Sequence, residues 1–293
     1  MNGFQDLPSQ QQQRFWVYTS KGVSNAFQTW SKPPGISFVH IITIGAGAGG
    51  SSGLGTNTTA GSLGGGGGGG SGGMTSVFLP AYLVPDILHI NVGLGGSGGA
   101  TTTSTTVRGT GVAGGATYVG YYPNQGAGYT LCVANAGAAG NSAGTGGGGG
   151  PIMVSTNMPV SQFGLRTYVV GQNGTQGTIS SGVGSLTAVY RITGGMGAWG
   201  GGTIGPTFSP PADYALTTYL PQTDPTLPGA GGMSDLLKFI FTTGMPPRST
   251  TGSSSPEAGN SAFGCGGPGG ASGNPNSGAG GRGGDGLVII TCV

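Results

Sequence analysis

The sequence predicts a mainly β protein: a glycine-rich, β-sandwich-like domain with polyglycine type II helical segments and very little α-helix. Three observations support this prediction. Glycine accounts for 70 of the 293 residues, about three times its usual share. Short apolar and β-branched runs alternate with glycine tracts, as expected for strands bounded by turns. Most ten-residue windows also contain glycine, which costs about 1 kcal/mol relative to alanine inside a helix.

Several apolar runs bounded by glycine or proline are predicted strands. They are residues 36–44, 87–92, 165–170, 186–193 and 287–291. The first run is apolar on both faces, which indicates a central strand buried on both sides. The last run is apolar in the same way, so we expect residues 36–45 to pair with residues 287–291. A short helix is predicted over residues 234–241, with Ser234 as its N-cap.

The glycine tracts have two possible structures. The longest are residues 64–70 and 146–150, and residues 264–286 form a third glycine-rich region. Gly/Ser-rich chain can act as a flexible linker. Alternatively, the tracts form packed polyglycine helices with three residues per turn and a rise of ~3.1 Å, hydrogen-bonded to their neighbours. Packed helices are favoured, because linkers seldom recur between strands this short.

The composition changes near residue 30. Residues 1–30 contain a glutamine tract and many aromatic residues but only Gly3 and Gly22. We therefore divide the chain into an N-terminal attachment or oligomerisation segment, 1–30, and a glycine-rich β domain, 31–293. The aromatic residues of the first segment are candidates for attachment to other subunits: Phe15, Trp16, Tyr18, Phe27 and Trp30.

The charge content argues against several functions. The chain carries 9 basic and 7 acidic residues and a net charge of +2. The basic residues are scattered singly, so no nucleic-acid partner is expected. The most apolar long window, residues 76–94, contains two prolines and Asp86, so no membrane insertion is expected. The N-terminus lacks a basic and an apolar region, so we expect no signal peptide and synthesis in a cytoplasm.

Motifs of catalysis and cofactor binding occur only in unsuitable contexts. Residues 45–50 match GxGxxG, but the glycine-rich chain that follows cannot form the helix that would hold a pyrophosphate. Ser71 and Ser97 lie in GxSxG patterns without a following helix, and His40 and His89 lie in predicted strands. We therefore predict no catalytic activity, cofactor or metal.

Two residue types remain to be assigned. The cysteines at positions 132, 265 and 292 are too widely spaced for a metal pair, so buried or unreactive thiols are expected. Tyrosines are the only plausible recognition residues, because they bind at low entropic cost. The receptor-contact candidates are Tyr121, Tyr122, Tyr214 and Tyr219. Packing of these loops over the core or against a neighbouring subunit is the alternative.

Three motifs occur in the same order in a known family. Residues 29–35 read TWSKPPG and lead into a strand that ends in a glycine block at 45–50. Residues 90–96 read INVGLGG, and residues 280–291 read GGRGGDGLVIIT. This pattern resembles the glycine-rich domain of bacteriophage tail proteins. It is also similar to the adhesins of some T-even-type tail fibres, although the glycine tracts here are less regularly spaced.

The resemblance implies a structural protein of the virion, in a tail fibre or tail tip, that contributes to host attachment. Its expected partners are other virion proteins and a host surface glycan or protein, and its expected location is the virion. The low content of large apolar side chains favours an oligomer, with a trimer as the leading candidate. A capsid-surface decoration or head-fibre protein is one alternative, and a non-viral glycine-rich matrix or ice-binding protein is another.

Overall fold

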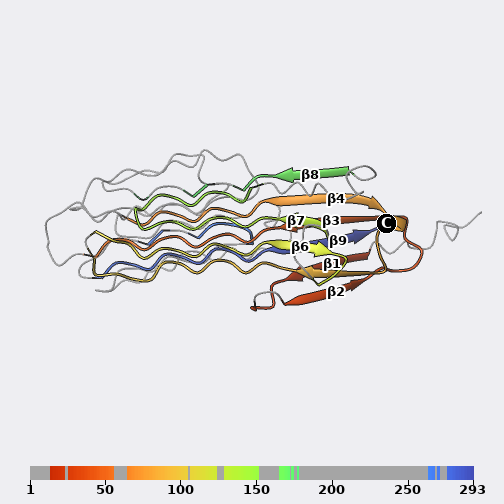
Figure 1. Cartoon of the computed structure of the whole chain (residues 1–293), viewed down its shortest axis with the longest axis horizontal. Helices are drawn as coiled ribbons and strands as arrows, with labels where there is room; N and C mark the ends of the chain where they lie inside the picture. The colour runs from red at the N-terminus through yellow and green to blue at the C-terminus, as the bar shows by residue number, and fades with distance from the viewer. Residues whose placement is uncertain are drawn as a thin grey trace, which may run out of the picture.

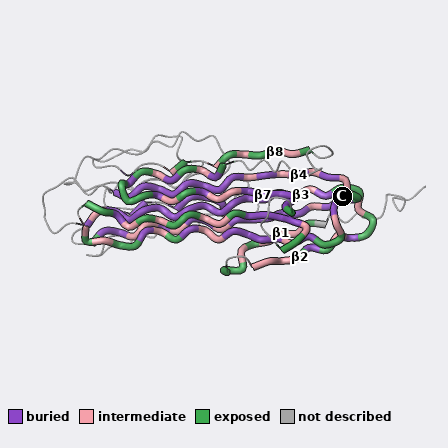
Figure 2. Tube along the Cα trace, viewed as in Figure 1, coloured by how far each residue is buried: buried purple, intermediate pink, exposed green. Residues whose placement is uncertain are grey.

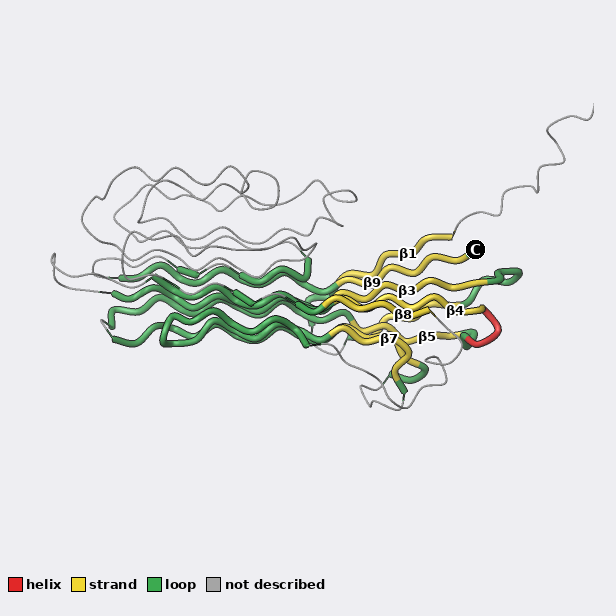
Figure 3. Tube along the Cα trace, turned by 90° about the horizontal axis from the view of Figure 1, so that it is seen from above, coloured by secondary structure: helices red, strands yellow, loops and turns green. Residues whose placement is uncertain are grey.

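A computed structural model describes residues 14–23, 26–55, 65–104, 106–123, 129–151, 165–171, 173–174, 177, 263–267, 269–270 and 276–293. In this part of the chain, the molecule is elongated and has two halves (Figure 1). One half contains all the described strands. The other, which we call the glycine bundle, consists of extended segments without regular strand structure that run side by side (Figures 1 and 3).

The strand half is built from two antiparallel sheets. The five-stranded sheet has the order β1(Arg14–Thr19), β9(Leu287–Cys292), β3(Phe38–Ile44), β4(Met74–Pro80), β8(Leu165–Val169). The four-stranded sheet has the order β2(Phe27–Ser31), β5(Ile87–Asn91), β6(Thr117–Gly120), β7(Thr130–Ala134). The only helical element among the described residues is the 3-10 turn η2(Ala81–Leu83). The prediction of a mainly β fold with very little helix is therefore confirmed.

The first and last strands of the glycine-rich region pair as predicted. Strands β3 and β9 are antiparallel neighbours, with Ile42 opposite Ile289 and Ile44 opposite Leu287. Strand β3 also pairs with β4 on its other edge, so it is central in its sheet. Its apolar sequence on both faces is explained by this position, because one face meets the second sheet and the other is partly covered.

The main hydrophobic core lies between the two sheets. It joins Ile41 and Leu79 of the larger sheet to Leu88, Ile90 and Val119 of the smaller one. A smaller cluster on the opposite face of the larger sheet contains Ile44, Leu287 and Ile289 and is covered by Phe263. The strands alternate between these clusters with the two-residue period of a pleated sheet.

Most predicted strands occur where they were expected. Residues 36–44, 87–92, 165–170 and 287–291 correspond to β3, β5, β8 and β9. The predicted strand at 186–193 and the predicted helix at 234–241 lie outside the described residues. Strands β1, β2, β4, β6 and β7 were not predicted; β1 and most of β2 lie in the segment 1–30, which differs in composition from the rest.

The N-terminal aromatic region differs from the segment we expected. Strand β1 pairs with β9, and β2 pairs with β5, so residues 14–31 supply one strand to each sheet. Residue 30 is therefore no boundary between folded units in the described chain. The physical reason is that the aromatic side chains contribute to the core: Trp30 is only 1% exposed, and Trp16 and Tyr18 pack against the same cluster.

The glycine bundle is held together by backbone hydrogen bonds with a three-residue period. Residues 45–53 continue directly from β3 and donate successive N–H groups to three different segments in rotation. The donors and acceptors of one turn are Gly47 N to Gly284 O, Ala48 N to Gly70 O, and Gly49 N to Val112 O, each 2.9 Å. The next turn repeats the order with Gly281, Gly67 and Gly109 as acceptors. A β-strand would instead alternate with a period of two.

The carbonyl groups of residues 45–53 are shared among three further segments. Ala46 O accepts from Gly137 N, Gly47 O from Gly96 N, and Ala48 O from Gly267 N. The central segment 45–53 is therefore surrounded by a ring of six segments. In order around the ring, they are 65–73, 135–140, 109–115, 93–99, 278–286, and 264–267 with 269–270. Each is also hydrogen-bonded to its two ring neighbours, so the ring is closed.

Side chains would not fit between these segments at most positions. A methyl group at Gly47 would overlap the carbonyl of Cys265, and one at Gly49 would overlap the carbonyl of Ser97. Accordingly, the central segment is buried throughout (Figure 2). The three-residue period of the hydrogen bonds between these segments is also the period of the polyproline II helix.

Candidate functional site

The end of the glycine bundle remote from the strands consists of turns rich in hydroxyl and amide side chains. Its exposed polar residues include Thr101, Thr103, Thr106, Asn141, Ser142 and Thr145. These residues connect segments that run outward from the strands to segments that return (Figure 1). We call these turns, residues 100–104, 106–108 and 141–145, the distal turns.

Short polar contacts order the distal turns. The N–H of Thr102 donates to Ser277 Oγ at 2.9 Å, and the N–H of Ser277 donates to the carbonyl of Thr102 at 2.9 Å. Ser104 Oγ accepts from the N–H of Val107 at 3.0 Å. Asn141 Oδ1 accepts from two N–H groups of its own turn. The exposed hydroxyls are therefore presented from turns with fixed backbone geometry.

A buried arginine lies beneath the same surface. The Nε of Arg108 donates to the carbonyl of Gly65 at 3.0 Å. A methyl group at Gly144 would overlap its guanidinium group, so this side chain connects three segments of the bundle. Burial lowers the pKa of Arg108, yet an arginine keeps its charge at neutral pH. Its contacts indicate a structural role.

The tyrosine candidates do not lie among the distal turns. Tyr121 and Tyr122 directly follow β6, at its end farthest from the glycine bundle (Figure 1). The N–H of Tyr121 donates to the carbonyl of Tyr129, and the ring of Tyr122 packs edge-on against Tyr129 with 5.4 Å between centroids. Tyr121 contacts the main core, and burial raises its pKa. Tyr122 is 60% exposed. Tyr214 and Tyr219 lie outside the described residues.

The N-terminal aromatic candidates divide into two groups. Trp30 is buried and packs edge-on against Trp16, with 5.9 Å between ring centroids. Phe27 packs against Tyr118, with 5.8 Å between centroids. Phe15 is 52% exposed on β1, which is the edge strand of its sheet. Phe15 is therefore the residue of this set most accessible to a partner.

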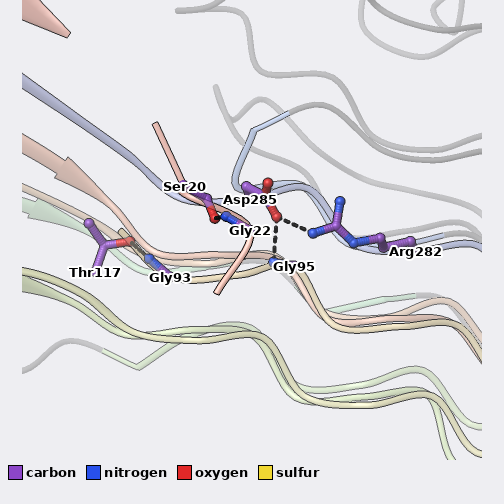
Figure 4. A network of polar contacts seen from close by, with 7 residues as sticks. All are labelled: Ser20, Gly22, Gly93, Gly95, Thr117, Arg282 and Asp285. Carbon is purple, nitrogen blue, oxygen red and sulfur yellow. Dashed lines mark hydrogen bonds and ion pairs between the residues drawn. The ribbon is translucent and has the colours of Figure 1, made fainter. Parts of the chain in front are cut away.

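A polar network joins the two halves of the molecule. Asp285 Oδ1 accepts from the N–H of Gly95 at 2.7 Å and from Nη2 of Arg282 (Figure 4). Arg282 and Asp285 are three residues apart, so a three-residue helix brings them to the same face. Close by, Thr117 Oγ1 accepts from the N–H of Gly93 at 3.0 Å. These bonds fix the point where bundle segments become strands.

The motifs that suggest a nucleotide site have a structural role instead. Each N–H group of residues 45–50 donates to a carbonyl of a neighbouring segment, so none of these donors faces a ligand. Ser71 is fully buried in the bundle. His40 is hydrogen-bonded to Ser76 Oγ at 2.7 Å. In the described part of the chain, no three histidine, cysteine or acidic residues form a cluster that could hold a metal ion.

The three cysteines are buried thiols. Burial raises the pKa of the Cys132 thiol to about 11, which leaves it protonated at neutral pH and a poor nucleophile. Its Sγ lies 3.2 Å from the hydroxyl of Thr43. The expectation of buried thiols is confirmed.

The two antiparallel sheets and the glycine bundle together define a glycine-rich β protein. A family described as a glycine-rich domain matches residues 20–293, and the chain belongs to this family. No curated protein matches the sequence. In addition, none of the helices in the described residues is long and apolar enough to span a membrane.

Sequence reasoning missed the distal turns as a candidate site. The run of threonine and serine at 101–106 is visible in the sequence, but recognition was expected from tyrosine residues alone. The turns 141–145 carry no motif at all. Their proximity depends on the return path of each glycine segment, which no side-chain pattern encodes.

Proposed function

We propose that this protein is a structural component of a bacteriophage virion, in a tail fibre or tail tip, that contributes to host-surface attachment without catalysis. The proposal rests on the three phage-like motifs between residues 29 and 291 and on the polarity of the molecule. The distal turns form one end of the glycine bundle. At the other end of the molecule, Arg14 at the start of β1 lies opposite Cys292 near the C-terminus.

This polarity suits a protein that is anchored at one end and exposed at the other. Among the described strands, β1 is paired on one side only, so its other side and the exposed ring of Phe15 are available to a neighbouring subunit. In this proposal, a trimer or another virion protein covers that edge. The distal turns then point away from the particle, where neutral hydroxyl groups can hydrogen-bond to a host glycan or protein.

The glycine bundle favours a mechanical role over an enzymatic one. Its interior presents backbone to backbone, because the N–H groups of residues 45–53 donate to carbonyls of neighbouring segments. Dense backbone hydrogen bonding between segments that lie side by side makes the glycine bundle a stiff support. Such a support can hold recognition turns far from an anchoring point.

Locating the protein in the particle tests the first part of the proposal. Antibodies raised against the purified chain should label the tail fibre or tail tip of intact virions in electron micrographs. Labelling of the capsid surface would support the decoration or head-fibre alternative. Absence of the chain from purified particles would overturn the proposal.

Substitution of the distal turns tests the second part. Thr101→Glu with Thr103→Glu should slow host adsorption, because two charges would replace neutral exposed hydroxyls. Thr29→Glu on β2 is the matched control and should leave adsorption unchanged. Phage particles made with either variant must contain normal amounts of the protein. Normal adsorption by the double variant would contradict a contact through these turns.

The tyrosines provide a separate comparison. Tyr122→Ala changes an exposed ring in the strand half, and Tyr214→Ala and Tyr219→Ala change the other receptor-contact candidates. Loss of adsorption in these variants, with normal adsorption in the threonine double variant, would move the proposed contact from the distal turns to the tyrosines.

A further inference from the structure

The surface of the glycine bundle carries a groove between the segments 93–99 and 109–115. The groove has a volume of about 430 Å³ and is lined by residues 91–97 and 112–116. The two segments are joined by bonds from Val112 N to Ser97 O and from Gly115 N to Leu94 O, each 2.8 Å. Apart from Asn91, Val92, Leu94 and Val112, the lining residues are glycine, alanine and serine, so backbone forms much of the surface.

The same chain contains an equivalent groove that is filled. The segments 65–73 and 135–140 are also ring neighbours, joined by bonds from Gly70 N to Ala138 O and from Gly73 N to Asn135 O. Residues 147–150 lie against this pair, outside the ring. Gly147 N donates to Gly68 O at 2.9 Å, Gly150 N donates to Ser71 O at 2.8 Å, and Gly148 O accepts from Ala138 N at 2.8 Å.

The open groove has free groups at the corresponding positions. Ser97 accepts from Val112 just as Ala138 accepts from Gly70, so the N–H of Ser97 corresponds to the N–H of Ala138. The acceptors Gly68 O and Ser71 O lie two residues before the donors Gly70 and Gly73. In the open groove, the corresponding carbonyls lie two residues before the donors Val112 and Gly115. They belong to Thr110 and Ala113. Among the described residues, Ser97 N–H and the carbonyls of Thr110 and Ala113 have no hydrogen-bond partner.

We propose that this groove binds an extended, polyproline II-type segment of a partner protein with glycine at every third position. The partner's carbonyl accepts from Ser97, and two of its N–H groups, three residues apart, donate to Thr110 and Ala113. The filled groove explains the glycine requirement. Methyl groups at Gly147 and Gly150 would crowd the carbonyls of Ala138 and Asn135, whereas one at Gly148 would meet only open space and Asn173 Oδ1 at 4.0 Å.

Two synthetic peptides test this pairing against the full-length protein. The first has five repeats of Gly-Ser-Pro, in which proline favours the extended helix and glycine supplies the donor N–H groups. The second has five repeats of Ala-Ser-Pro and differs only by the added methyl groups. Titration followed by NMR should shift the amide signals of Ser97 and Ala113 with the glycine peptide. The alanine peptide should bind at least about tenfold more weakly.

A variant that fills the groove provides a second test of peptide binding. Ala113→Tyr places a ring in the groove and should weaken binding of the glycine peptide by about tenfold or more. Ala100→Tyr, at an exposed alanine outside the lining, is the matched control and should bind normally. Both variants should keep the thermal unfolding temperature of the unchanged protein.

Several outcomes would overturn the inference. They are equal binding of the two peptides, shifts confined to residues outside the groove, or unchanged affinity in Ala113→Tyr. Failure of the glycine peptide to bind, with self-association that Ala113→Tyr abolishes, would instead assign the groove to a second copy of this chain. The assay needs no phage or host, so its result is independent of the proposed role in attachment.

Discussion

The two halves of the molecule are stabilised by opposite uses of side chains. In the strand half, large apolar residues such as Ile41, Leu79 and Leu88 fill the space between two sheets. In the glycine bundle, the central segment 45–53 is equally buried but contains only glycine, alanine and serine. Its neighbours approach closely because side chains are absent, and hydrogen bonds replace apolar contacts as the main attractive interaction.

This difference predicts opposite responses to mutation. Removing side-chain atoms should destabilise the strand half, because it leaves cavities. Adding a single methyl group should destabilise the bundle, because carbonyl oxygens already occupy that space. The junction between the halves should depend on particular polar contacts.

Gly47→Ala should cause the largest loss of stability. The added methyl group would overlap the carbonyl of Cys265 at the centre of the bundle. We expect a decrease in the free energy of unfolding of more than about 3 kcal/mol, or no soluble protein. Ala48→Gly, one position away, is the control and should cost about 1 kcal/mol or less. Urea denaturation measures both. Equal midpoints for Gly47→Ala and the unchanged protein would contradict close packing.

Ile90→Ala should destabilise the strand half substantially. Ile90 is fully buried between the sheets, and deleting such a side chain typically costs about 2–5 kcal/mol. Ile87 lies on the same strand but is 53% exposed, so Ile87→Ala should cost about 1 kcal/mol or less. The two variants are compared by denaturant midpoint. Similar losses of stability in the two variants would show that the core does not lie between the sheets.

Asp285→Ala should have an intermediate effect at the junction. It removes the acceptor for both Gly95 N–H and Arg282, and hydrogen bonds to charged groups contribute about 1.5–3 kcal/mol. The control is Asp86→Ala, which breaks the 2.9 Å ion pair with Lys32. Because the Asp86 side chain is 88% exposed, that change should cost only about 0–1 kcal/mol. Thermal unfolding should rank the variants in this order.

Acidification should produce the smallest effect. Burial lowers the pKa of His40 below its ordinary value of 6.5, so between the two pKa values the unfolded chain binds more protons than the folded one. The stabilisation from neutral His40 is therefore complete above pH 6.5 and decreases as the pH falls towards the folded-state pKa. His40→Gln should flatten this part of the stability profile. An unchanged slope in the variant would remove His40 as the cause.

Strands with strong apolar patterns could be predicted from the sequence, and the others could not. Strands β3 and β9 were recognisable because both of their faces are apolar, and this similarity also predicted their pairing. Strands β1 and β2 were assigned to a separate segment because the composition changes near residue 30. The density of aromatic residues there, Trp16 and Trp30 above all, was a signal for the core instead.

The arrangement of the glycine segments was beyond sequence reasoning. The tracts themselves indicated packed helices, but glycine has no side chain to specify a neighbour. The order of the ring depends on which strand each segment continues and on the distal turns that reverse it. For the same reason, the distal turns and the open groove between 93–99 and 109–115 could be found only from the folded chain.

The most direct test of the bundle is to measure its hydrogen bonds one by one. NMR scalar couplings across hydrogen bonds connect each donor nitrogen to its acceptor carbonyl carbon. We predict that the consecutive amides of Gly47, Ala48 and Gly49 couple to the carbonyls of Gly284, Gly70 and Val112, with slow hydrogen exchange at all three. Couplings to a single neighbour at alternate residues would indicate a β-strand instead. Rapid exchange of all three amides, without couplings, would indicate a flexible linker and contradict the account.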